Sequence, residues 1–437
     1  MRVFFGTVLA AALVAAAAQA QTAVPVDRVR AEAARLQPKV VAWRRDLHQN
    51  PELANREKRT AKVVADHLKK LGLEVRTGVA HTGVVGVLKG GKPGPVVAIR
   101  ADMDALPVEE KTGLPFASKA KGEFDGKPVS VAHACGHDSH VAMLMAAAEI
   151  LAGMKADIPG TIVFLFQPAE EGPPPAEGGG AKMMIEQGAL SNPAPSAIFG
   201  LHSLPGESGT IFYRSNGLMA AADQIHIKLK GKQTHGAWPW QGIDVVSLGA
   251  GIVSELNTVA ARQNDARIPL VLTIATVNAG VRYNIIPDEL TMTGTLRTFE
   301  PGQRTDMKAR IEKVVAAMAS TYGATSEVKF IESGPVTWND AGLAQGAFAA
   351  LEQAAGPGRV NRDALPTTVS EDFSYYQQKI PGLFYFLGTS KPGLDPKTAP
   401  PNHSPMFDID EAAMEVGVRA HVLTALAYLH GEIAPKP

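Results

Sequence analysis

The spacing of hydrophobic residues divides the chain into stretches of helical and of strand character. From residue 26 to about residue 71, apolar residues such as Val40, Trp43 and Leu47 recur every three or four positions, which predicts helix. Short apolar runs follow and alternate with helical segments, as in an α/β sheet that is covered on both faces. The elements expected here are strands at residues 83–88, 96–99, 161–166 and 197–201, and a helix at residues 141–151.

The pattern changes between residues 219 and 333, where the order of elements becomes β-α-β-β-α-β. This order is typical of a ferredoxin-like α+β sandwich that closes on itself, so we predict an inserted domain. After it the α/β texture returns, and the first domain is therefore expected to be discontinuous, over residues 24–218 and 334–437. The elements expected are strands at 224–229, 270–277, 290–297, 326–331 and 383–387, and helices at 245–261, 304–318, 343–355 and 411–429.

Composition limits the function only broadly. The 437 residues exceed what one compact core usually organises, which agrees with two domains. Lys and Arg together number 43, and so do Asp and Glu, so the formal net charge is zero. That balance gives no reason to expect a nucleic-acid or anionic-membrane partner.

The N-terminal residues resemble a targeting signal rather than part of the fold. Arg2 is followed by an apolar stretch over residues 3–18 and by the small-residue cleavage site Ala18-Gln19-Ala20. This pattern predicts a signal peptide over residues 1–20 and an exported, periplasmic protein. The alternative is a membrane anchor, but the apolar stretch is short for a span. No later segment is expected to cross a membrane.

Asp102 and Asp104 follow the strand predicted at residues 96–99. In open α/β sheets, ligands bind at the carboxyl ends of the strands, so both acids are candidate site residues. The alternative is a strand-end turn whose acids are solvated.

The segment from His133 to His140 is dense in histidine, cysteine and aspartate. Cys135 and His137 stand two residues apart in a glycine-containing loop just before a predicted helix, and this arrangement suits a metal. Asp138 could orient a histidine ligand. Because Cys135 is the only cysteine, it forms no internal disulfide, and the alternative is a small buried apolar residue.

Two adjacent glutamates, Glu170 and Glu171, follow the apolar strand predicted at residues 161–166. Neighbouring residues at a strand end point in different directions, so one carboxylate can bind a metal while the other acts as general base on water. Pairs of glutamates are also common on solvated surfaces, and the preceding buried strand is what favours the functional interpretation.

Two single histidines complete the candidate set, His202 at the end of a strand and His403 in Pro-Asn-His-Ser-Pro. Alone, each is more often structural or solvated than a ligand. Together with the segments above they predict two divalent metal ions, and sulfur and imidazole donors favour zinc over manganese or cobalt without deciding the identity. The predicted ligands are Cys135, His137, Glu171, His202 and His403.

Eight motifs, in order along the mature chain, resemble the binuclear-metal amidohydrolases related to aminoacylase. The branch they resemble most includes hippurate hydrolases, N-acyl-amino-acid amidohydrolases and plant auxin-conjugate hydrolases. The motifs are Arg-Ala-Asp-Met-Asp-Ala-Leu-Pro, His-Ala-Cys-Gly-His-Asp, Gln-Pro-Ala-Glu-Glu-Gly, Gly-Leu-His, Tyr-Asn-Ile-Ile-Pro-Asp, Gly-Thr-Leu-Arg-Thr-Phe, Ser-Glu-Asp-Phe and His-Ser-Pro.

The resemblance implies roles for individual residues. It implies a metallopeptidase-type catalytic domain whose five candidate ligands hold the metals, with Glu170 as the catalytic base and later acid. The inserted domain would be a lid and dimerisation domain. From it, His235 would hold the tetrahedral oxyanion, often in the partner subunit's site, and Asn284 would contact the substrate. Asp104 is expected to support the metal site, whereas Asp102 stands where distant relatives carry a histidine ligand.

Two departures from the family pattern bear on the substrate. A proline-rich insertion occupies residues 173–177, and Trp238 and Trp240 follow His235 where a smaller stretch is expected. The tryptophans could stack on an aromatic group or pack inside the small domain. We therefore expect an amidohydrolase of N-acyl amino acids, with an exported dipeptidase or carboxypeptidase of the same chemistry as the first alternative. A metal- or ligand-binding envelope protein without turnover is the second alternative.

Overall fold

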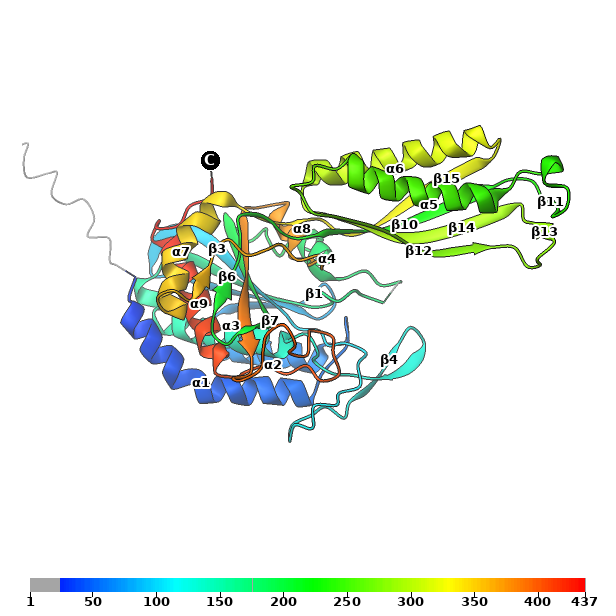
Figure 1. Cartoon of the computed structure of the whole chain (residues 1–437). Helices are drawn as coiled ribbons and strands as arrows, with labels where there is room; N and C mark the ends of the chain where they lie inside the picture. The colour runs from blue at the N-terminus through cyan, green and yellow to red at the C-terminus, as the bar shows by residue number, and fades with distance from the viewer. Residues whose placement is uncertain (1–23, 175, 437) are drawn as a thin grey trace, which may run out of the picture.

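The computed structural model describes residues 24–174 and 176–436, which form a broad body and a long, narrow one (Figure 1). The signal peptide predicted over residues 1–20 lies outside the described residues. No helix within the described part is long and apolar enough to cross a membrane.

The long helical segment predicted at residues 26–71 is two helices, so this prediction was wrong in detail. Helix α1 (Val26–Gln49) ends before Pro51, and helix α2 (Lys58–Lys70) begins after a short connection. A proline disfavours helical backbone in the residue before it, which ends α1. The carboxylate of Glu52 then accepts hydrogen bonds from the amides of Arg59 and Thr60, which start α2.

An eight-stranded sheet forms the centre of the broad body, in the order β1-β2-β6-β3-β7-β18-β8-β17. Its four middle strands run parallel to one another, so their carboxyl ends share one edge. The strands are β1 (Glu74–Val79), β2 (Gly83–Lys89), β6 (Pro159–Gln167), β3 (Lys92–Asp102), β7 (Ala197–Glu207), β18 (Gly382–Ser390), β8 (Ile211–Phe212) and β17 (Val360–Asn361).

Helices bury both faces of this sheet, as the apolar strands require. One core contains residues of α1, α2 and three further helices, and the opposite core contains residues of two short helices. The helices of the first core are α3 (His137–Gly153), α7 (Ala341–Ala355) and α9 (Ala413–Leu429), and those of the second are α4 (Gly180–Glu186) and α8 (Ser374–Gln377).

The narrow body is a four-stranded antiparallel sheet with two helices together on one face (Figure 1). It has a hydrophobic core of its own. This is the expected β-α-β-β-α-β sandwich, and the predicted fold class is confirmed. Its elements are β10 (Ala221–Lys230), α5 (Val245–Arg262), β12 (Leu270–Ala279), β14 (Glu289–Thr298), α6 (Pro301–Thr321) and β15 (Thr325–Gly334). The strands lie in the order β12-β14-β10-β15.

Three small two-stranded sheets also occur within the described residues. Strands β9 (Asn216–Met219) and β16 (Thr337–Asn339) pair where the chain passes between the two bodies. Strands β11 (Thr234–His235) and β13 (Ile285–Ile286) pair at the end of the small domain that is remote from the large sheet (Figure 1). A hairpin of β4 (Lys121–Phe124) and β5 (Lys127–Ser130) extends from the large domain.

Candidate metal centre and active site

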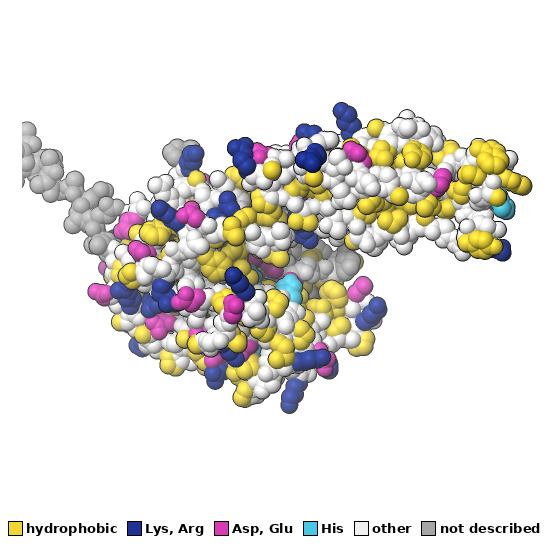
Figure 2. All heavy atoms as spheres, viewed as in Figure 1, with side chains coloured by type: hydrophobic (Ala, Val, Ile, Leu, Met, Phe, Trp, Pro, Cys, Tyr) yellow, Lys and Arg dark blue, Asp and Glu magenta, His cyan; other side chains and the backbone are white. Residues whose placement is uncertain are grey.

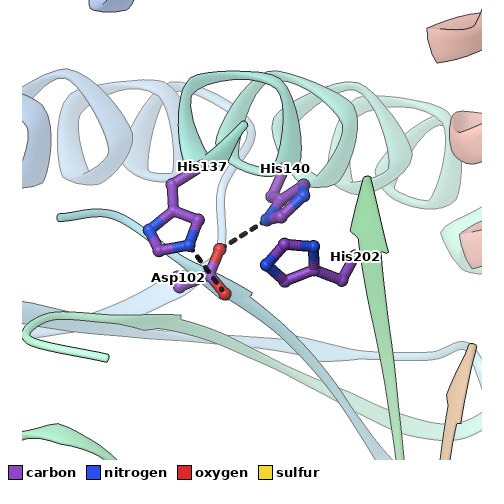
Figure 3. Close-up of side chains that lie close together, drawn as sticks. All are labelled: Asp102, His137, His140 and His202. Atoms are coloured by element: carbon purple, nitrogen blue, oxygen red, sulfur yellow. Dashed lines mark hydrogen bonds and ion pairs between the residues drawn. The ribbon is translucent and has the colours of Figure 1, made fainter. Parts of the chain in front are cut away.

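The carboxyl edge of the parallel strands gathers the predicted site residues, because each strand delivers a polar segment there. Asp102 is the last residue of β3, and His202 lies on the neighbouring strand β7. His137 begins helix α3, directly above this edge, and its ring faces Asp102 and His202 (Figure 3). The Glu170-Glu171 pair follows the end of β6.

Two histidines are held so that one ring nitrogen of each is free to bind a metal. The Nδ1–H of His137 donates to the main-chain oxygen of Asp104 at 2.8 Å, and the Nδ1–H of His202 donates to that of Ser203 at 2.9 Å. Each ring therefore presents the lone pair of Nε2. The Nε2 of His137 has no hydrogen-bond partner although the side chain is fully buried, which is the state expected of a metal ligand.

The other predicted ligands lie beside these two histidines. The Nε2 of His403 is 3.0 Å from a carboxylate oxygen of Glu171, and the Sγ of Cys135 is 3.5 Å from the Nε2 of His202. Ligand atoms of Cys135, Glu171 and His403 all lie within 4.8 Å of one another, and so do those of His137, Glu170 and Glu171. The structure thus brings the five predicted ligands together.

The electrostatics of the cluster favour a bound cation. Hydrogen bonds with Cys135 and Glu171 raise the pKa of His403 to about 10. Burial alone would lower the pKa of His137, but the charge of Asp102 raises it well above its usual value. Both shifts show that the surrounding groups attract positive charge, which divalent ions would supply. Thiolate, imidazole and carboxylate donors in this number fit such ions.

Glu170 lies at the edge of the cluster, where it faces one of the ligands. One of its oxygens is 3.9 Å from the Nε2 of His137. Burial, and then the negative charges of Glu371 and Glu171, raise the pKa of Glu170 well above its usual value. A carboxylate that is easily protonated and sits beside a metal site is suited to accept and return a proton.

Asp104 supports this arrangement through its neighbours. Its carboxylate accepts a hydrogen bond from the amide N–H of Glu171 at 3.0 Å, while its main-chain oxygen fixes the ring of His137. These contacts place Asp104 next to two of the predicted ligands, Glu171 and His137.

A buried histidine of the site was not assigned a role from the sequence. His140 lies one helical turn after His137, a spacing that could have revealed it. Its Nδ1–H donates to Asp102 at 2.6 Å and its Nε2 accepts the amide of Ser203 at 2.8 Å (Figure 3). Because both ring nitrogens of His140 are occupied, this residue holds Asp102 rather than a metal.

Arg100 and Glu371 form a second element of the site that was not predicted from the sequence. The guanidinium of Arg100 is buried and contacts Asp102, Glu371 at 2.9 Å and Asp372 at 2.9 Å. Glu371 and Asp372 lie beside Glu170, and these carboxylates would repel one another without the arginine. Glu371 and Asp372 belong to the motif Ser-Glu-Asp-Phe. The contact between Arg100 and Glu371 spans 271 residues, so no local pattern in the sequence indicates it.

A cavity of about 290 Å³ opens beside the ligands. Its apolar wall is formed by residues such as Leu204, Met219 and Phe386, and its polar end by candidate metal ligands and Glu170. None of the described residues that line it is a lysine or an arginine. The cavity therefore suits a small, largely apolar group placed against the metal site.

His235 and Asn284 do not join this site within one chain. Both lie at the free end of the small domain, where the amide of Gly236 donates to the main-chain oxygen of Asn284 at 2.8 Å. Hydrophobic side chains gather at this end (Figure 2), and Trp240 and Tyr283 are 75 % and 94 % exposed.

The contact between Gly236 and Asn284 adjoins the short β11–β13 pairing, in which His235 lies opposite Ile285. The ring of His235 is turned toward Trp238, with ring centroids 5.2 Å apart. Neither His235 nor Asn284 is among the described residues that line the cavity. A role for His235 or Asn284 at a metal site therefore requires either the metal site of another chain or a different arrangement of the two domains of their own chain.

The fold and the ligand cluster together define a metal-dependent hydrolase. A family model described as peptidase family M20/M25/M40 matches residues 98–427, and the chain belongs to this family. The resemblance to aminoacylase-related amidohydrolases is thereby confirmed.

Three similar proteins indicate the range of activities. The chain is 39 % identical over 410 residues to thermostable carboxypeptidase 2 of Saccharolobus solfataricus, covering 92 % of this chain and 98 % of that protein. It is 38 % identical over 382 residues to N-acetylcysteine deacetylase of Bacillus subtilis, covering 86 % and 93 %. A solved dinuclear metal-binding peptidase of the M20 family from Bacillus subtilis has a TM-score of 0.74 and 35 % identity, covering 90 % of this chain and 99 % of that one.

Proposed function

We propose that this hydrolase cleaves the amide bond of N-acyl amino acids and releases a carboxylic acid and a free amino acid. The observation that carries the proposal is the position of Glu170 between the ligand cluster and the apolar cavity. A carboxylate there can accept a proton from water and donate it to the leaving amine, while the cavity receives the acyl group or the amino-acid side chain.

The residues of this chain divide the reaction among them. Two divalent ions, when bound, would polarise the amide carbonyl and lower the pKa of the attacking water. Glu170 takes the proton from that water and hands it to the nitrogen of the leaving amine. The raised pKa of Glu170 suits both steps, because the protonated form must persist until the amide bond breaks. Cys135, His137, Glu171, His202 and His403 hold the ions, and zinc, manganese or cobalt is proposed for them.

We also propose a homodimer in which His235 of one chain completes the site of the other. The exposed aromatic side chains at the free end of the small domain support a contact with a second copy. None of the described residues that line the cavity is a lysine or an arginine, so an imidazole from a second copy would add a donor for the oxyanion to the action of the metal ions. His235 would supply that donor, and Asn284 would contact the substrate beside it.

A peptide is the alternative substrate. A carboxypeptidase and a deacetylase are similar to this chain to nearly the same degree, so identity does not separate peptide from N-acyl amino acid. The apolar cavity favours an uncharged acyl group over a peptide's free amino group, which would need a carboxylate besides the base Glu170, the ligand Glu171 and Glu371, which is bound to Arg100. Export to the periplasm is part of the proposal and rests on residues 1–20 of the sequence.

A substrate panel tests the proposed function. Release of free amino acid is measured from N-acetyl and N-benzoyl amino acids and from dipeptides, using the mature protein with zinc, manganese or cobalt. We expect metal-dependent cleavage of N-acyl amino acids that exceeds the cleavage of dipeptides with the same C-terminal residue. Cleavage of dipeptides alone would favour the peptidase alternative, and no turnover with metal firmly bound would favour the binding protein.

A further inference from the structure

The turn that carries Glu170 has an unusual backbone. Strand β6 ends at Gln167, and Ala169, directly before Glu170, has a φ of +54°. A residue other than glycine adopts this left-handed conformation at a cost on the order of 1 kcal/mol. Ala169 is also buried, so water does not hydrogen bond to its amide. The direction of the Glu170 side chain therefore depends on what holds Ala169.

Glu57 holds it. A carboxylate oxygen of Glu57 accepts a hydrogen bond from the amide N–H of Ala169 at 3.0 Å, across 112 residues of sequence. The second carboxylate oxygen accepts one from the hydroxyl of Thr82. Glu57 is fully buried, and it stands at the position before the first residue of α2.

The side chain of Glu57 is not needed by its own helix. A residue in this position commonly caps the helix with its side chain, but Glu57 makes no such bond. The carboxylate of Glu52 binds the free amides of α2 instead. Burying a carboxylate costs free energy, and capping of α2 does not account for the burial of Glu57. The contact of Glu57 with the Ala169 amide therefore needs another explanation.

A second carboxylate holds the other side of Glu170. Asp104 accepts a hydrogen bond from the amide N–H of Glu171 at 3.0 Å. The catalytic base thus lies between two amides, each fixed by a carboxylate from a different part of the fold. The two contacts together define the path of the backbone through Glu170.

We propose that Glu57 is a positioning residue for Glu170, an inference that rests on the proposed function. By accepting the amide of Ala169, Glu57 stabilises the left-handed turn and directs the Glu170 carboxylate toward the reacting atoms. The interaction depends on reach, because the acceptor oxygen must come within hydrogen-bond distance of one fixed amide. It does not depend on charge, because an amide oxygen accepts the same bond.

Two substitutions separate reach from charge. Glu57→Asp keeps the carboxylate but withdraws it by about 1.5 Å, the length of one carbon–carbon bond. Glu57→Gln keeps the reach and makes the side chain neutral at every pH. We expect kcat to fall roughly 10- to 100-fold in Glu57→Asp, with KM and metal content unchanged, because loss of the Ala169 contact would let Glu170 shift, and a misplacement of about 1 Å in a catalytic group has an effect of this size. Glu57→Gln should keep kcat within about threefold of the wild type.

Thr82→Val provides the matched control, because it removes the partner of the other carboxylate oxygen and leaves the Ala169 contact in place. Its kcat should stay near that of the wild type.

Loss of kcat in Glu57→Gln with retention in Glu57→Asp would overturn the inference, and so would wild-type kcat in both. If Glu57→Asp does not fold, Glu57→Gln still decides, since a lower kcat in that variant contradicts a role that depends on reach. Absence of turnover in the wild type would instead reject the proposed function.

Discussion

The Nε2 atom of His202 lies 3.5 Å from the Sγ atom of Cys135, although 67 residues separate them in the sequence. Strand β7 brings the imidazole and the loop before α3 brings the thiol. Burial raises the pKa of the Cys135 thiol, so without a metal the thiol would stay protonated. A metal would make it a thiolate, which explains why the one cysteine of the chain is placed among histidines.

Replacing Cys135 should therefore weaken metal binding. In Cys135→Ser a poorer ligand takes the place of the sulfur, and we expect the affinity for zinc to fall by about tenfold or more. Competition with a chromogenic chelator measures this affinity, and elemental analysis measures the metal retained. Unchanged stoichiometry and affinity would return Cys135 to the role of a small buried apolar residue.

His140 should act on the metal through Asp102. Since its Nδ1–H donates to Asp102 and its Nε2 accepts the amide of Ser203, His140→Phe removes both contacts at similar volume. We expect metal affinity to fall roughly 10- to 100-fold, as for other residues that orient a metal site. The same chelator competition provides the measurement, and an affinity equal to that of the wild type would show that Asp102 needs no such support.

His48 should make stability depend on pH. Burial would lower the pKa of His48, but its hydrogen bonds to Asp138 and Glu110 outweigh that effect and raise the pKa to about 9. The folded protein thus holds this proton more tightly than the unfolded chain does. The resulting stabilisation is complete below about pH 6.5 and is lost as the pH rises through about 9.

The size of this effect is on the order of 3 kcal/mol in the free energy of unfolding. Urea unfolding between about pH 6 and pH 10, with His48→Gln beside the wild type, measures it. The wild type should lose its advantage over the variant across this interval. A difference that is independent of pH would show that His48 does not carry the proton.

The proposed exchange of His235 between subunits can be tested by mixing two inactive variants. His235→Ala and Glu170→Gln each disable every site of their own homodimers. In a mixed dimer, one site combines an intact Glu170 with an intact His235 from the partner, so random mixing should restore about a quarter of the wild-type activity. If both residues acted within one chain, mixing would restore nothing. Sedimentation of each variant measures the oligomeric state.

Three of the predicted metal ligands lie in segments whose local pattern is informative, whereas the single histidines His202 and His403 were predicted only together with the rest of the set. Glu171 follows an apolar strand, and Cys135 and His137 stand in a loop before an apolar helix. The order of strands then carries such segments to a common edge. The general architecture followed from the same alternation of strands and helices, although the break before α2 depended on the local effect of Pro51.

Other parts of the site depend on contacts that no local pattern contains. Arg100 and Glu371, or Glu57 and Ala169, meet only because the sheet and its helices close around them. Each charged side chain alone is ordinary in the sequence. His235 raises a different difficulty, because its predicted contact lies between two copies of the chain.

The most direct test of the central claim replaces Glu170 by glutamine and measures both hydrolysis and metal content. The exposed Glu186 on the nearby helix α4 provides a matched control as Glu186→Gln. We predict that Glu170→Gln retains the metal content of the wild type and loses roughly 1,000-fold in kcat on N-acyl amino acids, while Glu186→Gln keeps both. Retention of most of the activity in Glu170→Gln would contradict the account.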